Sequence, residues 1–498
     1  MIRHLSILLA AGIIVALPFA LRQPDAHSDW QPGDPQLAIV SPHNEAIRYE
    51  FARAFSDWHR QQFGRPVKID WLNVGGATEI SRYLVSQFEA AKRTGTGVDL
   101  FFGGGEYDHR RAHEQGLTVP PWPAGQEPRE LLDMIPREIG GETWRTEAYI
   151  GTVVSTFGIC YNRDRLRDLG VTSPPTQWVD LTDPVYFRQL GVADPTKSGS
   201  IAKAFEMIIH QQMHESAVEQ GWENGVRVVQ LIGANARYFT DSASKVPIDV
   251  ATGDAAAGLA IDFYARFQAR VAGHDRMAYV TPVGGSSVSC DPISLLRGAP
   301  NREVAVRFIE FVLSKQGQRL WNDQLGKRCS RVRKYALCRL PIRRDFYPPH
   351  TYPQLCSSDD LSDPAINPYE LAKTFTYHPE WTAGHFGVHR DLIRAMCLDA
   401  GEELRAAWAA IIAGGGPQRQ PEAMTVMQRL PVTWSSALEV SKSRDRIDYM
   451  REWTGFFREN YRAVHRLAVR GGSDIPVATW GVKNRDRNVA PTNLAKER

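Results

Sequence analysis

Short apolar segments alternate with amphipathic ones in the early part of the chain. The segments "QLAIVSPHN" (36–44), "VKIDWLNV" (67–74) and "VDLFFGGG" (98–105) begin as apolar runs and lead into turns that contain glycine or hydroxyl residues. Beyond each turn the apolar residues recur at helical spacing, as Ile47, Phe51 and Phe55 do. Three repeats of strand, turn and helix predict an α/β lobe with a parallel sheet over residues 29–150.

The same pattern returns in the middle of the chain. The β-branched and aromatic stretch at 149–162 predicts one or two strands that cross between two lobes. Segment "LGVADPTKSGS" (190–200) predicts another strand and turn, and the small residues at 255–260 predict a tightly packed strand. We expect a second α/β lobe over 151–285, and a return of the chain to the first lobe with a closing helix over 286–328.

The pattern changes after Cys329. Residues 329–385 are rich in Pro, Tyr, Arg and Asp with little periodicity, which predicts an irregular, extended surface segment. Residues 390–413 and 445–469 again show helical spacing, so a mostly helical extension with a tail is expected over 386–498. Aromatic residues such as Trp453 and Phe457 predict that these helices pack on the second lobe, because their apolar faces require burial.

The N-terminus carries an export pattern. Arg3 and His4 precede an apolar run at 5–21, and the small residues around Ala26 and Ser28 fit a signal-peptidase site. This predicts a signal peptide over 1–28 and a periplasmic or otherwise extracytoplasmic protein. An uncleaved N-terminal anchor is the alternative.

Composition narrows the classes of protein. The 498 residues are too many for one ordinary core, so two or three packed units are expected. Basic and acidic residues number 59 and 56, a balance that gives no global field to attract nucleic acid. Six cysteines form an even set in a chain sent to an oxidising compartment. Cys329 and Cys338 can close a local loop, although the pairing stays open, while Cys160 and Cys290 are expected to be buried thiols on strands.

No motif of a nucleotide-binding or catalytic site is complete. "GGATEI" and "FFGGGE" miss the spacing of a dinucleotide-binding loop, and no phosphate-binding GxxxxGK[ST] loop, GxSxG elbow or Cys-x-x-Cys pair occurs. His109 and His113, like His210 and His214, stand four residues apart, but each pair is expected on a solvated helix face. We therefore expect no cofactor, no bound metal and no enzymatic activity.

Three stretches together resemble a known family. "DPTKSGS" (194–200), the segment from Asn235 to Ala265 and the segment from Val283 to Trp321 are similar to the extracytoplasmic solute-binding proteins of ATP-driven (ABC) importers. The group they resemble contains ferric-ion, phosphonate, sugar-phosphate and polyamine binders. The resemblance covers roughly residues 37–321. It implies a two-lobed fold of the type 2 periplasmic-binding-protein kind, with a ligand held between the lobes and with a helical C-terminal extension added.

The resemblance also implies where the ligand contacts lie. They fall in the turns after successive strands, at Ser41, His43, Gly76, Ala77, Thr78, Gly104, Gly105, Ser198, Gly199, Ser200, Asp241 and Ser242. Backbone N–H groups at helix starts and serine hydroxyls can bind an anion without a full counter-charge. Taken alone, Ser198 would be an ordinary helix cap.

These positions predict a protein that captures a small anionic or zwitterionic solute, acts as a monomer and delivers the solute to an ABC permease in the inner membrane. Ferric members of the family use adjacent tyrosines, whereas Tyr279 stands alone here, so a ferric-ion binder is the alternative within the class. A periplasmic sensory or scaffold module is the alternative from another class. A secreted hydrolase that uses Ser286 is the weakest alternative.

Overall fold

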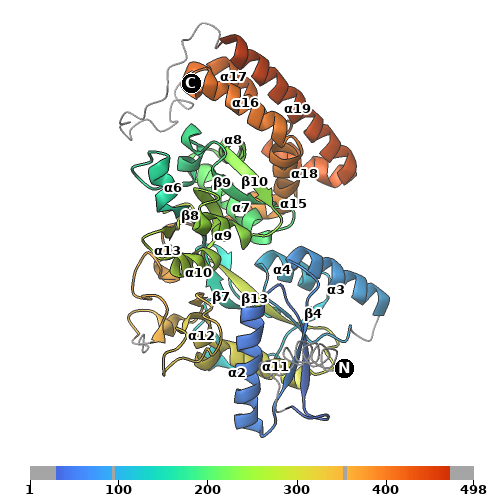
Figure 1. Ribbon diagram of the computed structural model, residues 1–498. Coiled ribbons are helices and arrows are strands. Elements are labelled where there is room, and N and C mark those ends of the chain that lie inside the picture. Colours follow the sequence, from blue (N-terminus) through green and yellow to red (C-terminus); the bar gives the residue numbers. More distant parts are fainter. Residues whose placement is uncertain (1–29, 92–95, 351–355, 472–498) are drawn as a thin grey trace, which may run out of the picture.

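The computed structural model describes residues 30–91, 96–350 and 356–471. The expected signal peptide and the tail after Gly471 lie outside these residues. Three parts follow one another along the long axis of the molecule, and they are one α/β lobe with α2 and α11, a second with α7 and α9, and a group of helices that includes α16 and α19 (Figure 1). The two-lobed α/β fold with a helical C-terminal extension is therefore confirmed.

The first lobe is built on a seven-stranded sheet in the order β14-β7-β13-β3-β1-β2, with β4 also paired to β13. Its strands are β1 (Gln36–Val40), β2 (Lys68–Leu72), β3 (Leu100–Phe102), β4 (Thr118–Val119), β7 (Ile150–Ser155), β13 (Ser289–Leu296) and β14 (Leu340–Pro341). β1 pairs in parallel with both β2 and β3, as three successive strand-turn-helix units require. A separate hairpin joins β5 (Glu138–Ile139) to β6 (Glu142–Thr143).

Four helices follow the early strands of this lobe: α2 (Glu45–Phe63), α3 (Ala77–Ala91), α4 (Glu106–Glu114) and α5 (Arg129–Leu132). The side chain of Asn44 caps α2 by accepting a hydrogen bond from Ile47 N at 3.1 Å. Gly64, at φ 76°, ends the helix in the left-handed conformation. Between these ends Phe51 and Phe55 are fully buried, so the apolar stripe holds α2 on the sheet.

The second lobe has a five-stranded sheet in the order β10-β9-β11-β8-β12. Its strands are β8 (Phe157–Asn162), β9 (Leu190–Ala193), β10 (Ala236–Thr240), β11 (Ala257–Ile261) and β12 (Met277–Val280). Its helices are α6 (Arg163–Asp168), η1 (Trp178–Thr182), η2 (Pro184–Tyr186), α7 (Gly199–Glu215), α8 (Val218–Asn235), α9 (Lys245–Thr252) and α10 (Asp262–Ala272). β11 is buried along its whole length, with the small residues Ala257, Gly258 and Ala260 beside the larger Leu259 and Ile261.

The chain crosses between the two sheets twice, from β7 to β8 and from β12 to β13. After β13 it forms α11 (Arg302–Leu313) and α12 (Lys315–Asn322). A single helix was expected over these residues. It is divided because Ser314 adopts an extended conformation and its side chain caps α12 by accepting from Gly317 N.

The irregular segment after Cys329 is not a surface segment. It contains β14, η3 (Arg344–Phe346), α13 (Pro368–Leu371), α14 (Pro379–Thr382) and η5 (Ala383–His385). Arg339, Ile342 and Tyr347 are essentially buried, so this segment completes the core of the first lobe. The local loop between Cys329 and Cys338 is also wrong, because Cys329 is bonded to Cys356 and Cys338 is a buried free thiol. Cys160 and Cys290 are buried thiols on strands, as expected.

The same segment ties the two lobes together at Tyr377. Its backbone N donates to Gly140 O in the β5–β6 hairpin at 2.7 Å, and its hydroxyl donates to Glu206 Oε1 of α7 at 3.0 Å. Gly141, at φ 78°, leaves no room for a Cβ because Tyr377 O would lie 1.8 Å from it. The contact therefore depends on glycine in the hairpin of the first lobe.

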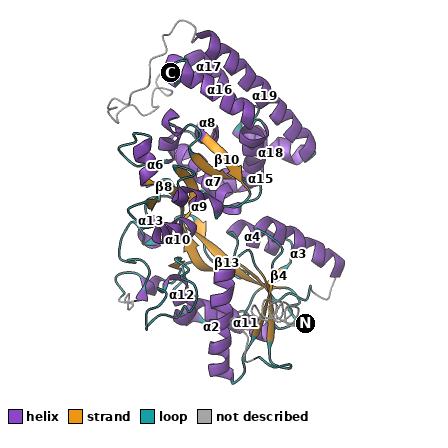
Figure 2. Cartoon of the chain, in the orientation of Figure 1, coloured by secondary structure: helices purple, strands orange, loops and turns teal. Residues whose placement is uncertain are grey.

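The last part of the described chain is all helical (Figure 2). It comprises α15 (Phe386–Ile393), a π-helical turn η6 (Arg394–Asp399), α16 (Gly401–Ala413), η7 (Pro417–Arg419), α17 (Pro421–Met427), α18 (Trp434–Ser443) and α19 (Arg446–Gly471). Trp453 and Phe457 share one hydrophobic core with the second lobe, as expected. The continuous helix expected over 390–413 is instead interrupted at Ala400, where φ is −104°. Among the described residues, no helix has the length and apolarity to cross a membrane.

Only one member of each histidine pair lies on a solvated face. His109 and His210 are fully buried, while His113 and His214 are exposed. The ring of His109 stacks on Phe101 at 4.0 Å between centroids, and its Nδ1 lies 2.7 Å from Ser294 Oγ. The prediction failed because the neighbours that cover each buried ring are distant in sequence. No group of three metal-ligating side chains is found within the described ranges.

Candidate functional site

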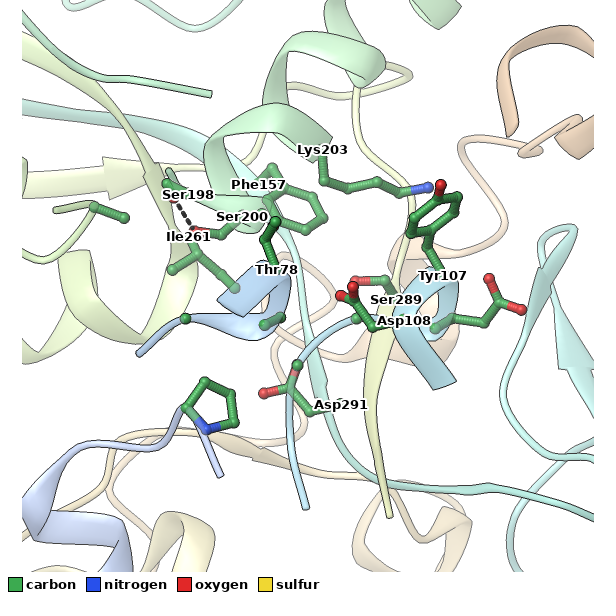
Figure 3. Close-up of a pocket in the computed structure, with 18 of the residues that line it drawn as sticks. Thr78, Tyr107, Asp108, Phe157, Ser198, Ser200, Lys203, Ile261, Ser289 and Asp291 are labelled. Atoms are coloured by element: carbon green, nitrogen blue, oxygen red, sulfur yellow. Dashed lines mark hydrogen bonds between the residues drawn. The ribbon is translucent and has the colours of Figure 1, made fainter. Parts of the chain in front are cut away.

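A cleft of about 370 Å³ lies between the two lobes and is lined by both. Eleven of the twelve residues predicted from the sequence line it: His43, Gly76, Ala77, Thr78, Gly104, Gly105, Ser198, Gly199, Ser200, Asp241 and Ser242. They come together because the carboxyl ends of parallel strands meet at one edge of each sheet. Figure 3 shows Thr78 of the first lobe beside Ser200 of the second, with Asp108 farther along the cleft near Ser289.

Ser41 is the predicted residue that does not line the cleft. It is fully buried, and its Oγ accepts a hydrogen bond from His43 N at 3.1 Å. Its carbonyl oxygen accepts from Arg48 at 3.0 Å. Ser41 therefore shapes the turn after β1 and presents His43 to the cleft.

The helices that begin at the cleft include α2, α3, α4 and α7. The first N–H groups of a helix have no partner within the helix, and the summed peptide dipoles give that end a partial positive charge. Four such ends around one volume create a field that favours an anion.

His43 lies against the glycine turn after β3. A Cβ on Gly103 would lie 2.5 Å from two atoms of the imidazole, and Gly103 has φ 87°, so only glycine fits there. The side chain of His43 is buried, and neither ring nitrogen has a hydrogen-bond partner among the described residues. Burial lowers the pKa of His43, so the ring is neutral at pH 7. It faces the cleft as an uncharged donor or acceptor.

The turn "DPTKSGS" is built by Asp194, which sequence reasoning did not single out. One carboxylate oxygen of Asp194 accepts from Thr196 N at 2.8 Å and from Thr196 Oγ1 at 2.7 Å. Ser198 then caps α7 by accepting from Ile201 N at 3.3 Å. Ser200 contacts Ser198 through their hydroxyls at 3.2 Å, as Figure 3 shows. Ser198 is thus a cap that also lines the cleft.

Carboxylates line the first lobe's side of the cleft, and the sequence reasoning missed them. They are Glu106, Asp108, Glu142 and Asp291. Burial raises the pKa of Asp108, which accepts a hydrogen bond from Ser81 at 3.0 Å. Burial also raises the pKa of Glu106, which lies 3.1 Å from Arg110. Glu106 and Asp108 lie in the first turn of the helix after "GGG", and this position could have marked them as cleft residues.

Lys203 joins the two lobes through charge. Its Nζ lies 3.0 Å from Glu142 Oε1 of the first lobe and 2.9 Å from Glu206 Oε2 on its own helix. The ammonium also lies 3.6 Å from the ring centroid of Tyr377. Burial opposes its charge, but the two carboxylates raise the pKa of Lys203 well above its ordinary value. Lys203 follows Ser200 by less than one helical turn, so its place on the cleft was readable from sequence.

The side chains that the two alternative functions require are Tyr279 for ferric-ion binding and Ser286 for hydrolysis, and neither is placed for that role. Tyr279 is absent from the described lining of the cleft, and its hydroxyl lies 3.2 Å from Thr156 Oγ1. Ser286 is buried, and its Oγ accepts from Phe157 N at 2.9 Å and donates to Ser287 O at 3.1 Å. No histidine or carboxylate bonds to Ser286 in the described part of the chain, so nothing there activates it as a nucleophile.

Comparisons with known proteins agree with this architecture. Residues 127–337 match the family of bacterial extracellular solute-binding proteins. The phosphoglycerate transport regulatory protein PgtC of Salmonella typhimurium is 25% identical over 215 residues, which cover 43% of this chain and 48% of PgtC. Matches to curated relatives span 48% to 62% of those proteins' own length.

Solved structures show the same fold at low identity. The periplasmic binding protein AfuA from Actinobacillus pleuropneumoniae, solved with fructose-6-phosphate, is 19% identical with a TM-score of 0.50, covering 68% of this chain and 93% of AfuA. Iron-bound HitA from Pseudomonas aeruginosa is 17% identical with a TM-score of 0.51, covering 73% of this chain and 100% of HitA. The fold is therefore that of the two-lobed periplasmic binding proteins. Within that class, residues 127–337 are similar to the bacterial extracellular solute-binding proteins.

Proposed function

We propose that this protein captures a small anionic or zwitterionic solute, such as a phosphonate or sugar phosphate, in the cleft between its lobes. One observation carries the proposal: helix starts from both lobes converge on a single cleft of about 370 Å³. That volume is at the low end of the ~300–1,000 Å³ of small-molecule sites. Contacts from both lobes favour closure over an open state.

We further propose that the protein works as a monomer in the periplasm and delivers the solute to the permease of an ABC importer. The family match of residues 127–337 supports this. A ferric ion is the less favoured cargo, because Tyr279 is not among the described residues that line the cleft.

A screen for thermal stabilisation tests the proposal, because a ligand that binds only the folded protein raises its melting temperature. Phosphonates, sugar phosphates, polyamines and ferric salts are the compounds to compare. We expect stabilisation by a phosphorylated or phosphonate compound. Stabilisation by ferric salts alone would replace the proposal with the ferric alternative.

A double variant then tests the site. Ser198→Ala with Ser200→Ala removes two hydroxyls from the start of α7, so we expect the stabilising compound to lose binding in calorimetry. The empty protein should lose only about 1 kcal/mol of stability, the usual value of a cap. Unchanged binding together with a large loss of stability would leave these serines a purely structural role.

A sensory module is a second candidate. The relative PgtC is described as a transport regulatory protein, and phosphoglycerate is an anion of the proposed class. Affinity purification of the tagged protein from membranes distinguishes the two candidates. Recovery of a permease supports delivery, and recovery of a histidine kinase supports sensing.

A further inference from the structure

The chain beyond the matched family segment reaches the cleft, through residues of the 329–385 segment and of the helical extension. Tyr377, Ala383, Phe386 and Arg390 all line it, although the family match ends at residue 337. Phe386 packs on Tyr107 of the first lobe, with 5.2 Å between ring centroids. A wall of the cleft is therefore built from chain that the matched family segment does not include.

Arg390 lies between the turns of the two lobes. Its NH2 group donates to Thr78 Oγ1 of the first lobe at 3.0 Å. The same group donates to Thr196 O at 2.8 Å, and Nε donates to Pro195 O at 2.8 Å, both in the turn before α7. One guanidinium thus contacts the polar turns that we propose as the two halves of the anion site.

Arg390 forms no direct ion pair among the described residues, although the carboxylates of Asp108 and Asp391 are near enough to favour its charge. Four lysine or arginine side chains line the cleft, and three of them form ion pairs with carboxylates: Arg110 with Glu106, Lys197 with Asp241, and Lys203 with Glu142 and Glu206. Within the described residues, Arg390 has no carboxylate within 4 Å, and its hydrogen bonds go to neutral oxygen atoms. Burial outweighs this attraction and lowers the pKa of Arg390, so a half-buried cation without a direct partner gains from an anion that binds beside it.

We propose that Arg390 is a solute-binding residue, whose guanidinium is the counter-charge for a phosphate or phosphonate group of the solute held at the start of α7. This deepens the proposed function and rests on it. It selects a doubly charged phosphate monoester or phosphonate over a singly charged ester, because each further negative charge gains from the unpaired cation. The extension is then a third wall of the site, and recognition differs from that of a protein with the two lobes alone.

Calorimetry with two probes tests this inference. The probes are glycerol 3-phosphate, a dianion at pH 8, and its monoanionic methyl ester. We expect Arg390→Met to weaken binding of the dianion about 10- to 100-fold and of the ester less, so that the preference for the dianion falls. Arg390→Lys should recover part of the preference, since it keeps the charge and loses the planar fork.

Arg446→Met is the matched control. Arg446 pairs with Asp391 at 2.6 Å, next to Arg390 in sequence, but does not line the cleft, so both affinities should stay as in the wild type. If Arg390→Met weakens both probes by the same factor, Arg390 only holds the two turns and the inference is wrong. If Arg390→Met binds as well as the wild type, the inference also fails while the proposed function stands. A wild type that binds neither probe, nor any other anion in the thermal screen, would overturn both.

Discussion

The two lobes line the cleft with different chemistry. The lobe-1 wall, formed by the turns after β1, β2 and β3 and by β13 and the β5–β6 hairpin, combines glycines with carboxylates such as Asp108 and Asp291. The lobe-2 wall, formed by the turns after β9 and β10 and by α7, combines hydroxyls with Lys197 and Lys203, which pair with Asp241 and Glu206 of the same wall. The lobe-1 wall contains glycines such as Gly104, whose positive φ disfavours any side chain. The lobe-2 wall contains hydrogen-bond donors at the start of a helix. The difference suits a polar solute that presents an anionic group to the second wall.

The largest expected effect comes from the lysine that connects the walls. Lys203→Met leaves the carboxylates of Glu142 and Glu206 buried without their cation, so we expect a loss of about 3–5 kcal/mol in the free energy of unfolding. Urea denaturation of the empty protein measures it. Lys197→Met is the control on the same wall, because its pair with Asp241 is exposed and should contribute less than about 1 kcal/mol. Equal losses in the two variants would show that Lys203 is not a buried link.

The next effect compares a glycine from each wall. Gly103→Ala places a Cβ 2.5 Å from the ring of His43 at φ 87°, so we expect a loss of about 2–4 kcal/mol. Gly199→Ala meets no atom within 4 Å and needs no positive φ, so it should be neutral or stabilise by up to about 1 kcal/mol. Denaturant midpoints of the two variants test this contrast. A Gly103→Ala protein as stable as the wild type would mean that His43 moves away at little cost.

The smallest effect concerns the histidine of the lobe-1 wall. Burial lowers the folded-state pKa of His43 below its ordinary value of 6.5. As the pH falls through about 6.5 the unfolded chain takes up this proton and the folded chain does not, so stability is lost on acidification. His43→Gln should therefore reduce the loss of stability between pH 7 and pH 5 by about 1 kcal/mol.

Thermal unfolding across this pH range measures that difference. His113→Gln, which changes an exposed histidine outside the cleft, should keep the slope of the wild type. A His43→Gln protein with the wild-type slope would mean that the buried ring does not resist protonation.

The sequence predicted the parts of the fold that depend on local pattern. Each strand-turn-helix unit carries its own signal, since apolar period, glycine turn and helix start lie within a few residues. The candidate site residues came from the family resemblance, and topology explains why eleven of them meet, because strand ends that are distant in sequence lie at one sheet edge. Ser41 was misplaced because its hydroxyl bonds to the backbone of its own turn.

The remaining features depend on contacts between distant segments. His109 is buried because Phe101 and Ser294 cover it, and Cys329 pairs with Cys356 because the chain between them folds back. Arg390 lies on a helix beyond the matched family segment, and no strand-and-turn motif comes before that helix. Neither signal used for the other site residues therefore applied to it. Contacts between residues this far apart in sequence cannot be predicted from a local sequence pattern.

Tyr377 sets a mechanical limit on the molecule. The β7–β8 and β12–β13 crossings link the lobes, and Tyr377 adds a fastening from Gly140 of one lobe to Glu206 of the other. A wide swing has to break that fastening, whereas a small one can stretch it. Opening of the cleft about those crossings is therefore limited by a contact outside them, together with the Lys203–Glu142 pair and the Arg390–Thr78 hydrogen bond.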